Sequence, residues 1–261
     1  MANHHETRLE LLSGPEIAVY MAELNLLYIP VAPLEWHGPH LPYGTDPLNA
    51  YAVCLEASRR LGGLVHPVVY AGTEIARRPE IVRAFGLPAE TPVVGMDMPG
   101  FALKSFYMTP DRFKSCVQAV VATAASVGFT KIVVVNGHGA DEQKRILKEL
   151  AAEMSGPNLE VIYFIVFDTG DEEALKNIGH ADRIETEFTL ANYPHLVHID
   201  RLPTKGRLRY SDYGIVDSEA FVGVPTPDFT TREDPRKANL ERGRLMIEQV
   251  LHRLAQVIGQ P

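Results

Sequence analysis

Cysteine and basic charge are both scarce in this sequence. Its two cysteines, Cys54 and Cys116, lie inside apolar helical patterns, where we expect reduced core thiols rather than a disulfide or a nucleophile. Lysine and arginine number 25 against 33 aspartates and glutamates, and the formal net charge is -8. Because such a chain offers no basic surface for phosphate backbones or anionic lipid, we expect neither nucleic acid nor a membrane as a partner.

Long apolar runs are absent as well, which bears on where the protein works. No stretch reaches 18 consecutive apolar residues, and residues 1–8 are polar and lack the apolar region of a secretory signal. We therefore expect a soluble protein of the cytoplasm. With 261 residues that are 46% hydrophobic, the chain can bury a proper core, and its length suits a single domain over residues 1–261.

What the sequence does contain is an alternation of buried strands and amphipathic helices. Short apolar runs predict strands at residues 26–33, 64–70, 131–135 and 161–167. Capping residues and helical spacing predict helices at residues 13–24, 109–128, 141–155 and 184–192, one that starts at Asp46-Pro47, and a long last helix capped by Asp234-Pro235. Alternation of this kind indicates an α/β fold with a largely parallel sheet that is covered on both faces.

Residues 71–108 interrupt this alternation. The segment has no clean period and contains four prolines and four glycines, so it predicts a long functional loop with short elements. Loops of this length often cover a site.

Candidate metal ligands directly follow two of the predicted strands. The segment Glu35-Trp36-His37 leaves the first strand, and residues 136–139, which read NGHG, leave the third. Because ligands of parallel sheets gather outside the carboxyl ends of strands, we expect the two segments to converge. Residues two apart in an extended segment point the same way, so Glu35 and His37 can face one site while Trp36 turns away.

Each candidate also has a simpler interpretation. A lone Glu-x-His is most often a solvated pair, and Asp46 ahead of Pro47 has the features of a helix N-cap. Against the cap, residues 37–46 form a compact loop that could return Asp46 to His37. His138 lies between two glycines after a strand, where the backbone can approach a ligand closely and neighbours cannot bury the imidazole.

Four ordered motifs resemble those of the creatininase family. Residues 33–46 read PLEWHGPHLPYGTD and look like the family signature, and residues 136–139 resemble its second motif. Residues 180–186, HADRIET, resemble the family segment His-Ala-Gly-x-x-Glu-Thr-Ser, and residues 234–243, DPRKANLERG, are similar to its carboxy-terminal segment. The resemblance spans nearly the whole chain. It implies a three-layer α/β/α sandwich with a mostly parallel central sheet, hydrolysis of carbon–nitrogen bonds, and a homo-oligomer, often a hexamer.

The resemblance also implies two divalent metal ions per chain, which would be zinc, manganese or iron. Glu35 and His138 would bind one ion, His37 the other, and Asp46 would bridge them, while His180 matches a catalytic histidine of the family. The chemistry of these side chains agrees, because histidine and carboxylate suit such ions. Two ions about 3.5 Å apart make a bridging water acidic enough to attack an amide as hydroxide.

Charge balance requires a third carboxylate, because Glu35 and Asp46 alone leave much of the charge of two divalent ions without a counter-charge. Creatininase itself places a glutamate two residues after the histidine of the second motif, where this sequence has Ala140. Glu185, in the third motif, is the first choice, both as a metal ligand and as a member of the catalytic site. Asp141 and Glu142 are the alternatives. By itself, a helical glutamate such as Glu185 is most often solvated.

The substrate is less well defined by the sequence. Creatininase itself holds its planar substrate with tryptophans of later loops, whereas the single tryptophan here is Trp36, for which packing is favoured; creatinine is therefore a poor candidate. We expect a small amide, lactam or formamide, bound at substrate-site candidates Trp36, His40, Glu74, Arg77 and Phe101. Two alternatives stay open: a metal-dependent isomerase or lyase acting on a carbonyl compound, and a non-catalytic binding protein that kept the fold.

Overall fold

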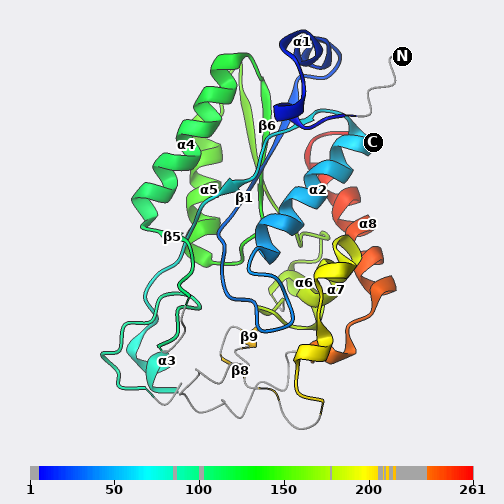
Figure 1. The fold of residues 1–261 in the computed structure, drawn as a ribbon. Helices are drawn as coiled ribbons and strands as arrows, with labels where there is room; N and C mark the ends of the chain where they lie inside the picture. Colours follow the sequence, from blue (N-terminus) through cyan, green and yellow to red (C-terminus); the bar gives the residue numbers. More distant parts are fainter. Residues whose placement is uncertain are drawn as a thin grey trace.

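A parallel β-sheet forms the centre of the molecule in the computed structural model (Figure 1). The structure describes residues 6–84, 87–99, 103–176, 178–204, 208, 210–211, 214–215 and 234–260. Within these residues the sheet has five strands, β1 (Leu26–Ala32), β2 (Leu64–Val65), β3 (Val69–Tyr70), β6 (Lys131–Asn136) and β7 (Glu160–Ile165). β1 pairs with β6 on one side and with β2 and then β3 on the other, and β7 pairs with β6, all in parallel.

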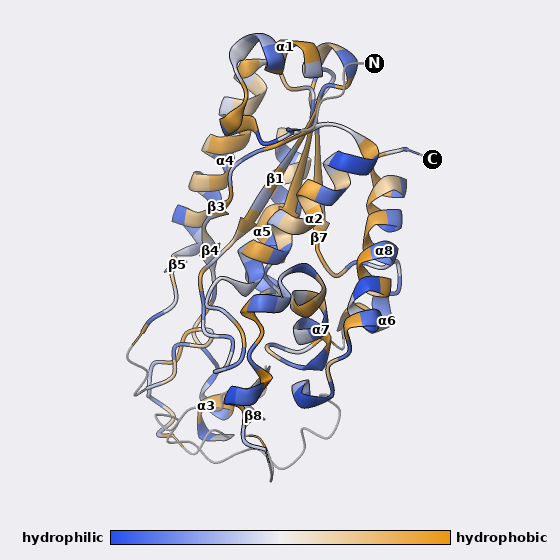
Figure 2. Ribbon diagram, turned by 45° about the vertical axis from the view of Figure 1, so that its right-hand side comes forward, coloured by the Kyte–Doolittle hydropathy of each residue, from blue (hydrophilic) through white to orange (hydrophobic). Residues whose placement is uncertain are grey.

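Helices cover both faces of this sheet and produce three layers. One face packs on α1 (Gly14–Glu23), α4 (Pro110–Val127) and α5 (Asp141–Met154), and it receives Leu27 and Ile29 of β1. The other face packs on α2 (Thr45–Leu61), α7 (Arg183–Asn192) and α8 (Leu240–Val257), and it receives Leu26 and Tyr28. The central strands are hydrophobic along their length (Figure 2), as expected of strands covered on both faces. The three-layer α/β/α fold class is confirmed.

Short elements complete the described chain. The 3-10 helices are η1 (Leu9–Leu11), η2 (Pro194–Leu196), η3 (Ile199–Arg201) and η4 (Pro235–Lys237). The helix α6 (Glu172–Lys176) follows β7, and β8 (Tyr210–Ser211) pairs antiparallel with β9 (Gly214–Ile215). Residues 71–108, predicted as a long loop with short elements, hold β4 (Gly72–Thr73), α3 (Pro79–Ala84) and β5 (Tyr107–Met108).

The starts of two helices follow their capping sequences. At α1, the N–H of Ser13 donates to Glu16 Oε2 at 2.7 Å and the Ser13 side chain accepts the N–H of Glu16, so the predicted capping box is confirmed. At α4, Thr109 is the cap residue and Pro110 takes the first helical position, where its missing N–H costs no hydrogen bond.

Two predicted boundaries were wrong, each for a local reason. The predicted strand at residues 64–70 is divided into β2 and β3, because Pro67 has no N–H to donate to a neighbouring strand. The last helix begins at Leu240, after the predicted cap. Asp234 caps only the short turn η4, whereas the Asn239 side chain accepts two N–H groups of the following turn and starts α8.

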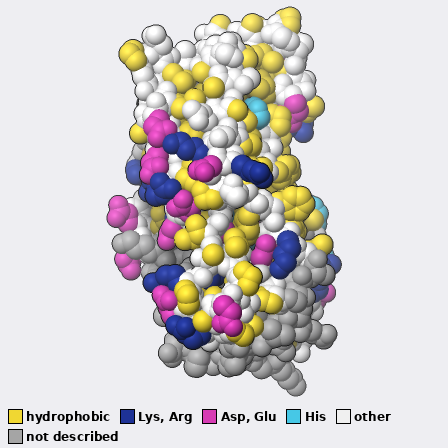
Figure 3. Space-filling model, turned by 90° about the vertical axis from the view of Figure 1, so that its left-hand side faces the viewer, with side chains coloured by type: hydrophobic (Ala, Val, Ile, Leu, Met, Phe, Trp, Pro, Cys, Tyr) yellow, Lys and Arg dark blue, Asp and Glu magenta, His cyan; other side chains and the backbone are white. Residues whose placement is uncertain are grey.

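Charges of both signs share the surface. On the face shown in Figure 3, acidic and basic side chains lie beside each other across the middle of the molecule. Some of the charged residues pair between helices, as Lys114 Nζ of α4 does with Glu153 Oε1 of α5 at 2.8 Å. Over the described residues, no helix is both long and apolar enough to cross a membrane.

Candidate metal centre

A tight loop after β1 brings Glu35, His37 and Asp46 together. The N–H of Glu35 donates to the carbonyl of Tyr43 at 2.9 Å, which folds the loop back on itself. As predicted, Asp46 returns to His37, and its Oδ1 lies 3.0 Å from His37 Nε2. All three residues are almost completely buried. The helix-cap interpretation of Asp46 is wrong, because Gly44 occupies the cap of α2 and the carboxylate turns toward the histidine.

Asp46 lies between two histidines. Its second oxygen, Oδ2, is 3.0 Å from Nδ1 of His138, so each oxygen faces a different imidazole. The backbone permits this contact because residue 137 is glycine: a Cβ there would lie 2.3 Å from the carbonyl oxygen of Asp46. Asn136 fixes the loop by accepting the N–H of His138 and donating to its carbonyl, at 3.0 and 2.8 Å. The two segments that follow strands thus converge, as the sequence predicts.

Glu185 reaches the same site from the start of α7. Asp182 caps this helix by accepting the N–H of Glu185 at 3.1 Å. Glu185 Oε1 lies 3.7 Å from His37 Nε2, and the residue is only 5% exposed, so the solvated interpretation is wrong. The two alternative carboxylates lie outward: the Asp141 side chain is 99% exposed, and Glu142 is bound to an arginine of its own helix.

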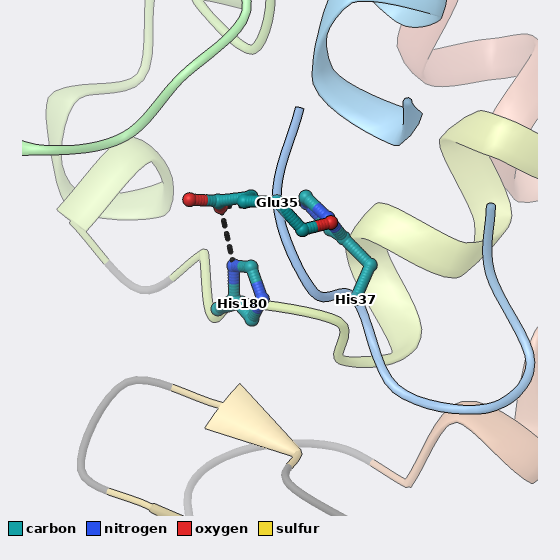
Figure 4. Close-up of side chains that lie close together, drawn as sticks. All are labelled: Glu35, His37 and His180. Atoms are coloured by element: carbon teal, nitrogen blue, oxygen red, sulfur yellow. Dashed lines mark hydrogen bonds and ion pairs between the residues drawn. The ribbon is translucent and has the colours of Figure 1, made fainter. Parts of the chain in front are cut away.

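His180 lies in the loop before α7, as predicted, and joins the cluster (Figure 4). Its Nδ1 is 3.1 Å from Glu35 Oε1, and its ring centroid is 4.2 Å from that of His37. Its Nε2–H donates to the backbone carbonyl of Trp36. Because a carbonyl can only accept, Nε2 carries a proton and Nδ1 is the nitrogen that faces the site.

His37 is oriented in a similar manner. Its Nδ1–H donates to the backbone carbonyl of Glu35 at 3.1 Å, which directs Nε2 toward Asp46 and Glu185. Metal-binding histidines in proteins commonly donate their second ring N–H to a carbonyl or a carboxylate. The backbone around this loop therefore holds the imidazole in an orientation that suits a metal ligand.

Buried charge dominates the site. Burial alone would raise the pKa of the Glu35 carboxyl, but the neighbouring imidazoles hold that pKa well below its usual range. Burial would lower the pKa of both His37 and His138, yet the carboxylates around them raise the pKa of His138 to about 10 and that of His37 well above its usual value. Among the described residues, no lysine or arginine pairs with Glu35, Asp46 or Glu185. The protonated imidazoles supply positive charge to these three buried carboxylates, and bound cations could take over that role.

Divalent metal ions fit this set of donors. Among the described residues, two groups of three ligand atoms, each within 4.8 Å of one another, share Asp46: Glu35, Asp46 and His138 form one, and His37, Asp46 and Glu185 the other. A third group, Glu35, His37 and His180, has a member in common with each. Imidazole and carboxylate together suit zinc, manganese and iron(II), and two dications would balance the buried carboxylates.

A cavity of about 380 Å³ opens onto these residues. The end of β7 and the segment around α6 line it with the apolar side chains of Ile165, Phe167, Leu175 and Ile178. Two other segments contribute charged side chains, namely Glu74, Arg77, Asp141, Glu142 and Lys144. The candidate metal centre therefore adjoins a space of the size that small-molecule ligands occupy.

The structure brings only part of the predicted substrate site to this cavity. Glu74 and Arg77 line the cavity, as predicted. Trp36 and His40 do not line it. Phe101 lies outside the described residues. Trp36 packs against an apolar cluster of the long loop, the role that the sequence favours. His40 is fully buried, its Nε2 lies 3.0 Å from Thr186 Oγ1, and burial lowers its pKa to about 3. His40 therefore contacts α7 through Thr186 and does not line the cavity.

Tyr107 belongs to the site although no sequence pattern indicated it. It lies in β5, and its O–H donates to Glu35 Oε2. Its ring lines the cavity, with its centroid 6.0 Å from that of His138. Burial and the charge of Glu35 raise the pKa of Tyr107 well above its usual value, so the phenol stays protonated. Local spacing cannot reveal a contact between residues 72 positions apart.

Comparison with known proteins finds relatives over most of the chain. A family model described as "Creatininase: Creatinine amidohydrolase" matches residues 10–258. The creatinine amidohydrolase of Pseudomonas putida is 24% identical over 255 residues, which are 90% of this chain and 89% of that protein. The 3-dehydro-scyllo-inosose hydrolase of Thermotoga maritima is 23% identical over 198 residues, which are 72% of this chain and 57% of that protein.

Solved structures share the fold. A crystal structure of creatinine amidohydrolase (creatininase) has a TM-score of 0.69 at 23% identity, covering 98% of this chain and 97% of that one. Creatininase in a manganese form and a mutant in a zinc–zinc form give TM-scores of 0.68 and 0.66, each at 23% identity and covering 97% of both chains. At this level of identity, the likeness establishes the fold.

Proposed function

The chain belongs to the creatininase family, and from this membership and the geometry of its site we propose that it is a metal-dependent amidohydrolase of a small amide, lactam or formamide. The observation that carries the proposal is the position of Asp46, whose two oxygens each lie 3.0 Å from a histidine of a different donor group. A carboxylate so placed suits a two-metal centre. The two relatives act on creatinine and on an inosose, so the substrate is itself part of the proposal.

The two donor groups divide the metal ligands between them. Glu35, Asp46 and His138 would hold one divalent ion, and His37, Asp46 and Glu185 the other. We propose zinc or manganese, which related creatininase structures contain, and iron(II) also suits these ligands. When bound, the ions would polarise the substrate carbonyl and lower the pKa of the attacking water so that it reacts as hydroxide.

His180 is placed to protonate the leaving nitrogen. An amide nitrogen is too basic to depart without a proton, and imidazole is well suited to deliver one. Because the Trp36 carbonyl holds the Nε2–H of His180, the nitrogen that would carry the transferred proton is Nδ1. His180 lines the cavity, where it can meet a bound substrate.

The walls of the cavity would select the substrate. The single tryptophan of the chain packs away from the cavity, so a planar ring would lack the stacking partner that tryptophan provides. We therefore propose that creatinine is a poor substrate. Glu74 and Arg77 would orient polar groups of the substrate, and the apolar residues after β7 would contact its hydrocarbon part.

Metal analysis and a substrate panel test this function. Protein purified without chelator should carry about one to two transition-metal ions per chain. Metal-loaded protein should release ammonia, an amine or formate from a member of a panel of amides, lactams and formamides, and creatinine, the comparator, should react far more slowly. A rearranged product without such release would favour the isomerase or lyase alternative. Metal-free protein would favour a binding protein and contradict the proposal.

The proposal also covers the oligomeric state of the protein and its location in the cell. On the family resemblance, we propose a homo-oligomer, with a hexamer as the specific form, that works in the cytoplasm. Light scattering of the purified protein measures its mass directly.

The Glu185→Gln variant should bind metal more weakly, because the amide keeps the shape of the side chain but removes the third anion of the site. We expect the affinity for one ion to fall by about 10-fold or more, measured by competition with a chromophoric chelator. Asp141→Asn and Glu142→Gln are matched controls, since each removes a carboxylate from the same cavity. The reverse pattern would assign the third carboxylate to the start of α5.

Metal loading should release protons. In the metal-free protein at pH 7, His138 is charged because its pKa is raised to about 10, and the raised pKa of His37 keeps it charged as well. The carboxyls of Glu35 and Asp46, whose pKa values are lowered, are already ionised and release nothing. A ligand histidine must be neutral, so about two protons per chain should leave at pH 7, and metal affinity should rise with pH.

Calorimetric titration with zinc in buffers of different ionisation enthalpy measures this release. The slope of the observed heat against buffer enthalpy gives the number of protons. A slope near zero would mean that the imidazoles are neutral before the metal arrives.

A further inference from the structure

Tyr107 and the histidines divide the two oxygens of Glu35 between them. Oε2 accepts the phenolic hydrogen of Tyr107. Oε1 faces three imidazoles, at 3.1 Å from His180 Nδ1, 3.4 Å from His138 Nδ1 and 3.7 Å from His37 Nε2. One oxygen of the carboxylate is thus engaged by the long loop, while the other is directed into the candidate metal centre.

The hydroxyl of Tyr107 is held in place from several sides. The residue pairs with Gly72 across the short β4–β5 ladder. The N–H of Met96 donates to Tyr107 Oη at 3.4 Å. Residue 95 must be glycine for this contact, because its φ is +53° and a Cβ there would lie 2.5 Å from Oη. The long loop therefore presents a fixed donor to Glu35.

We propose that Tyr107 is a positioning residue that engages Glu35 Oε2 so that this ligand offers a single oxygen, Oε1, to the ion it shares with Asp46 and His138. The inference rests on the proposed metal-dependent function and adds to it a residue that contacts no ion. Hydrogen bonds to ligating carboxylates fix their orientation, and their removal typically costs about 10–100-fold in metal affinity. The long loop thereby sets the geometry of the metal centre as well as lining the cavity.

The variant Tyr107→Phe tests this inference, because it removes the hydroxyl and keeps the ring. Zinc titration against a chromophoric chelator should show one of two binding events weakened by about 10–100-fold and the other changed by less than about 2-fold. The visible spectrum of the cobalt(II)-loaded variant should differ from that of the parent protein, since the coordination of Glu35 changes. A purely structural role of Tyr107 would move neither measurement selectively.

Tyr28→Phe is the matched control. Tyr28 is buried in β1, and its hydroxyl makes no hydrogen bond within the described part of the chain. Its loss should leave both binding events and the cobalt spectrum unchanged. Gly95→Ala is a second test that leaves Tyr107 in the sequence but displaces its hydroxyl, because the added Cβ would lie 2.5 Å from Oη, and it should weaken the same binding event as Tyr107→Phe.

The outcomes separate this inference from the function on which it rests. If the parent protein binds no metal, the proposed function fails. If the parent protein binds two ions and Tyr107→Phe binds both equally well with an unchanged cobalt spectrum, the positioning role alone is overturned. Equal weakening of both events would also overturn it, because Glu35 belongs to only one of the two proposed ligand sets.

Discussion

Replacing Asp46 with alanine should empty both metal sites and abolish turnover. Each oxygen of this carboxylate lies 3.0 Å from a histidine of a different donor group, so both groups lose a ligand at once. Stabilisation by metal ions contributes several kcal/mol to reactions of this type, so the rate should fall by about 10³-fold or more. Elemental analysis and turnover of the best amide of the panel measure the two effects.

Asp141→Ala is the matched control for this variant. It removes a carboxylate that lines the same cavity but whose side chain is 99% exposed, and it should retain both ions. If Asp46→Ala affected only the stability of α2, the free energy of unfolding would fall by about 1 kcal/mol and the metal content would stay intact. Retention of either ion at full occupancy by Asp46→Ala would show that the carboxylate does not serve both sites.

The variant His180→Ala should retain both ions yet lose about 10²–10⁴-fold in turnover of an amide with a poor leaving group. Its Nδ1 faces the site while its Nε2–H is held by the Trp36 carbonyl, which suits a proton donor. With an activated anilide, whose nitrogen leaves more easily, the loss should shrink markedly. The ratio of the two losses is the measurement that identifies a general acid.

His180 could also act as a metal ligand, and the experiment must exclude this alternative. His180 forms a donor group with Glu35 and His37, and its orientation would equally suit a metal ligand. Departure of an ion from His180→Ala would assign that role. An equal loss on both substrates, with the ions retained, would make His180 a residue that positions the substrate.

Local patterns were sufficient to predict the layers of the fold and the loop that returns Asp46 to His37. Strands such as β1 are buried on both faces, so their apolar runs are visible in the sequence, and strand ends in parallel sheets meet at one edge. The third carboxylate was harder, because a helical glutamate gives the same pattern whether it is solvated or buried. Only the packing of α7 shows that Glu185 is 5% exposed.

The sequence did not reveal the roles of residues that depend on distant partners. Tyr107 contacts Glu35 from 72 positions away, and His40 contacts Thr186 from 146 positions away, so neither contact produces a local pattern in the sequence.

The start of the last helix was predicted wrongly for another reason. Asp234 and Asn239 both have side chains that can accept N–H groups, and the sequence does not show which of the two caps the longer helix.

The order of the strands sets when the site can form during synthesis. β1 emerges first, with the loop that carries Glu35, His37 and Asp46, but its partner β6 and then β7 are made later. Parallel neighbours can pair only after the connection between them exists. One donor group is incomplete until residue 138 has been synthesised, and the other until residue 185 has. Before then, a nascent chain presents an ion with only the loop after β1. The complete set of ligands, and with it tight metal binding, exists only in the finished fold.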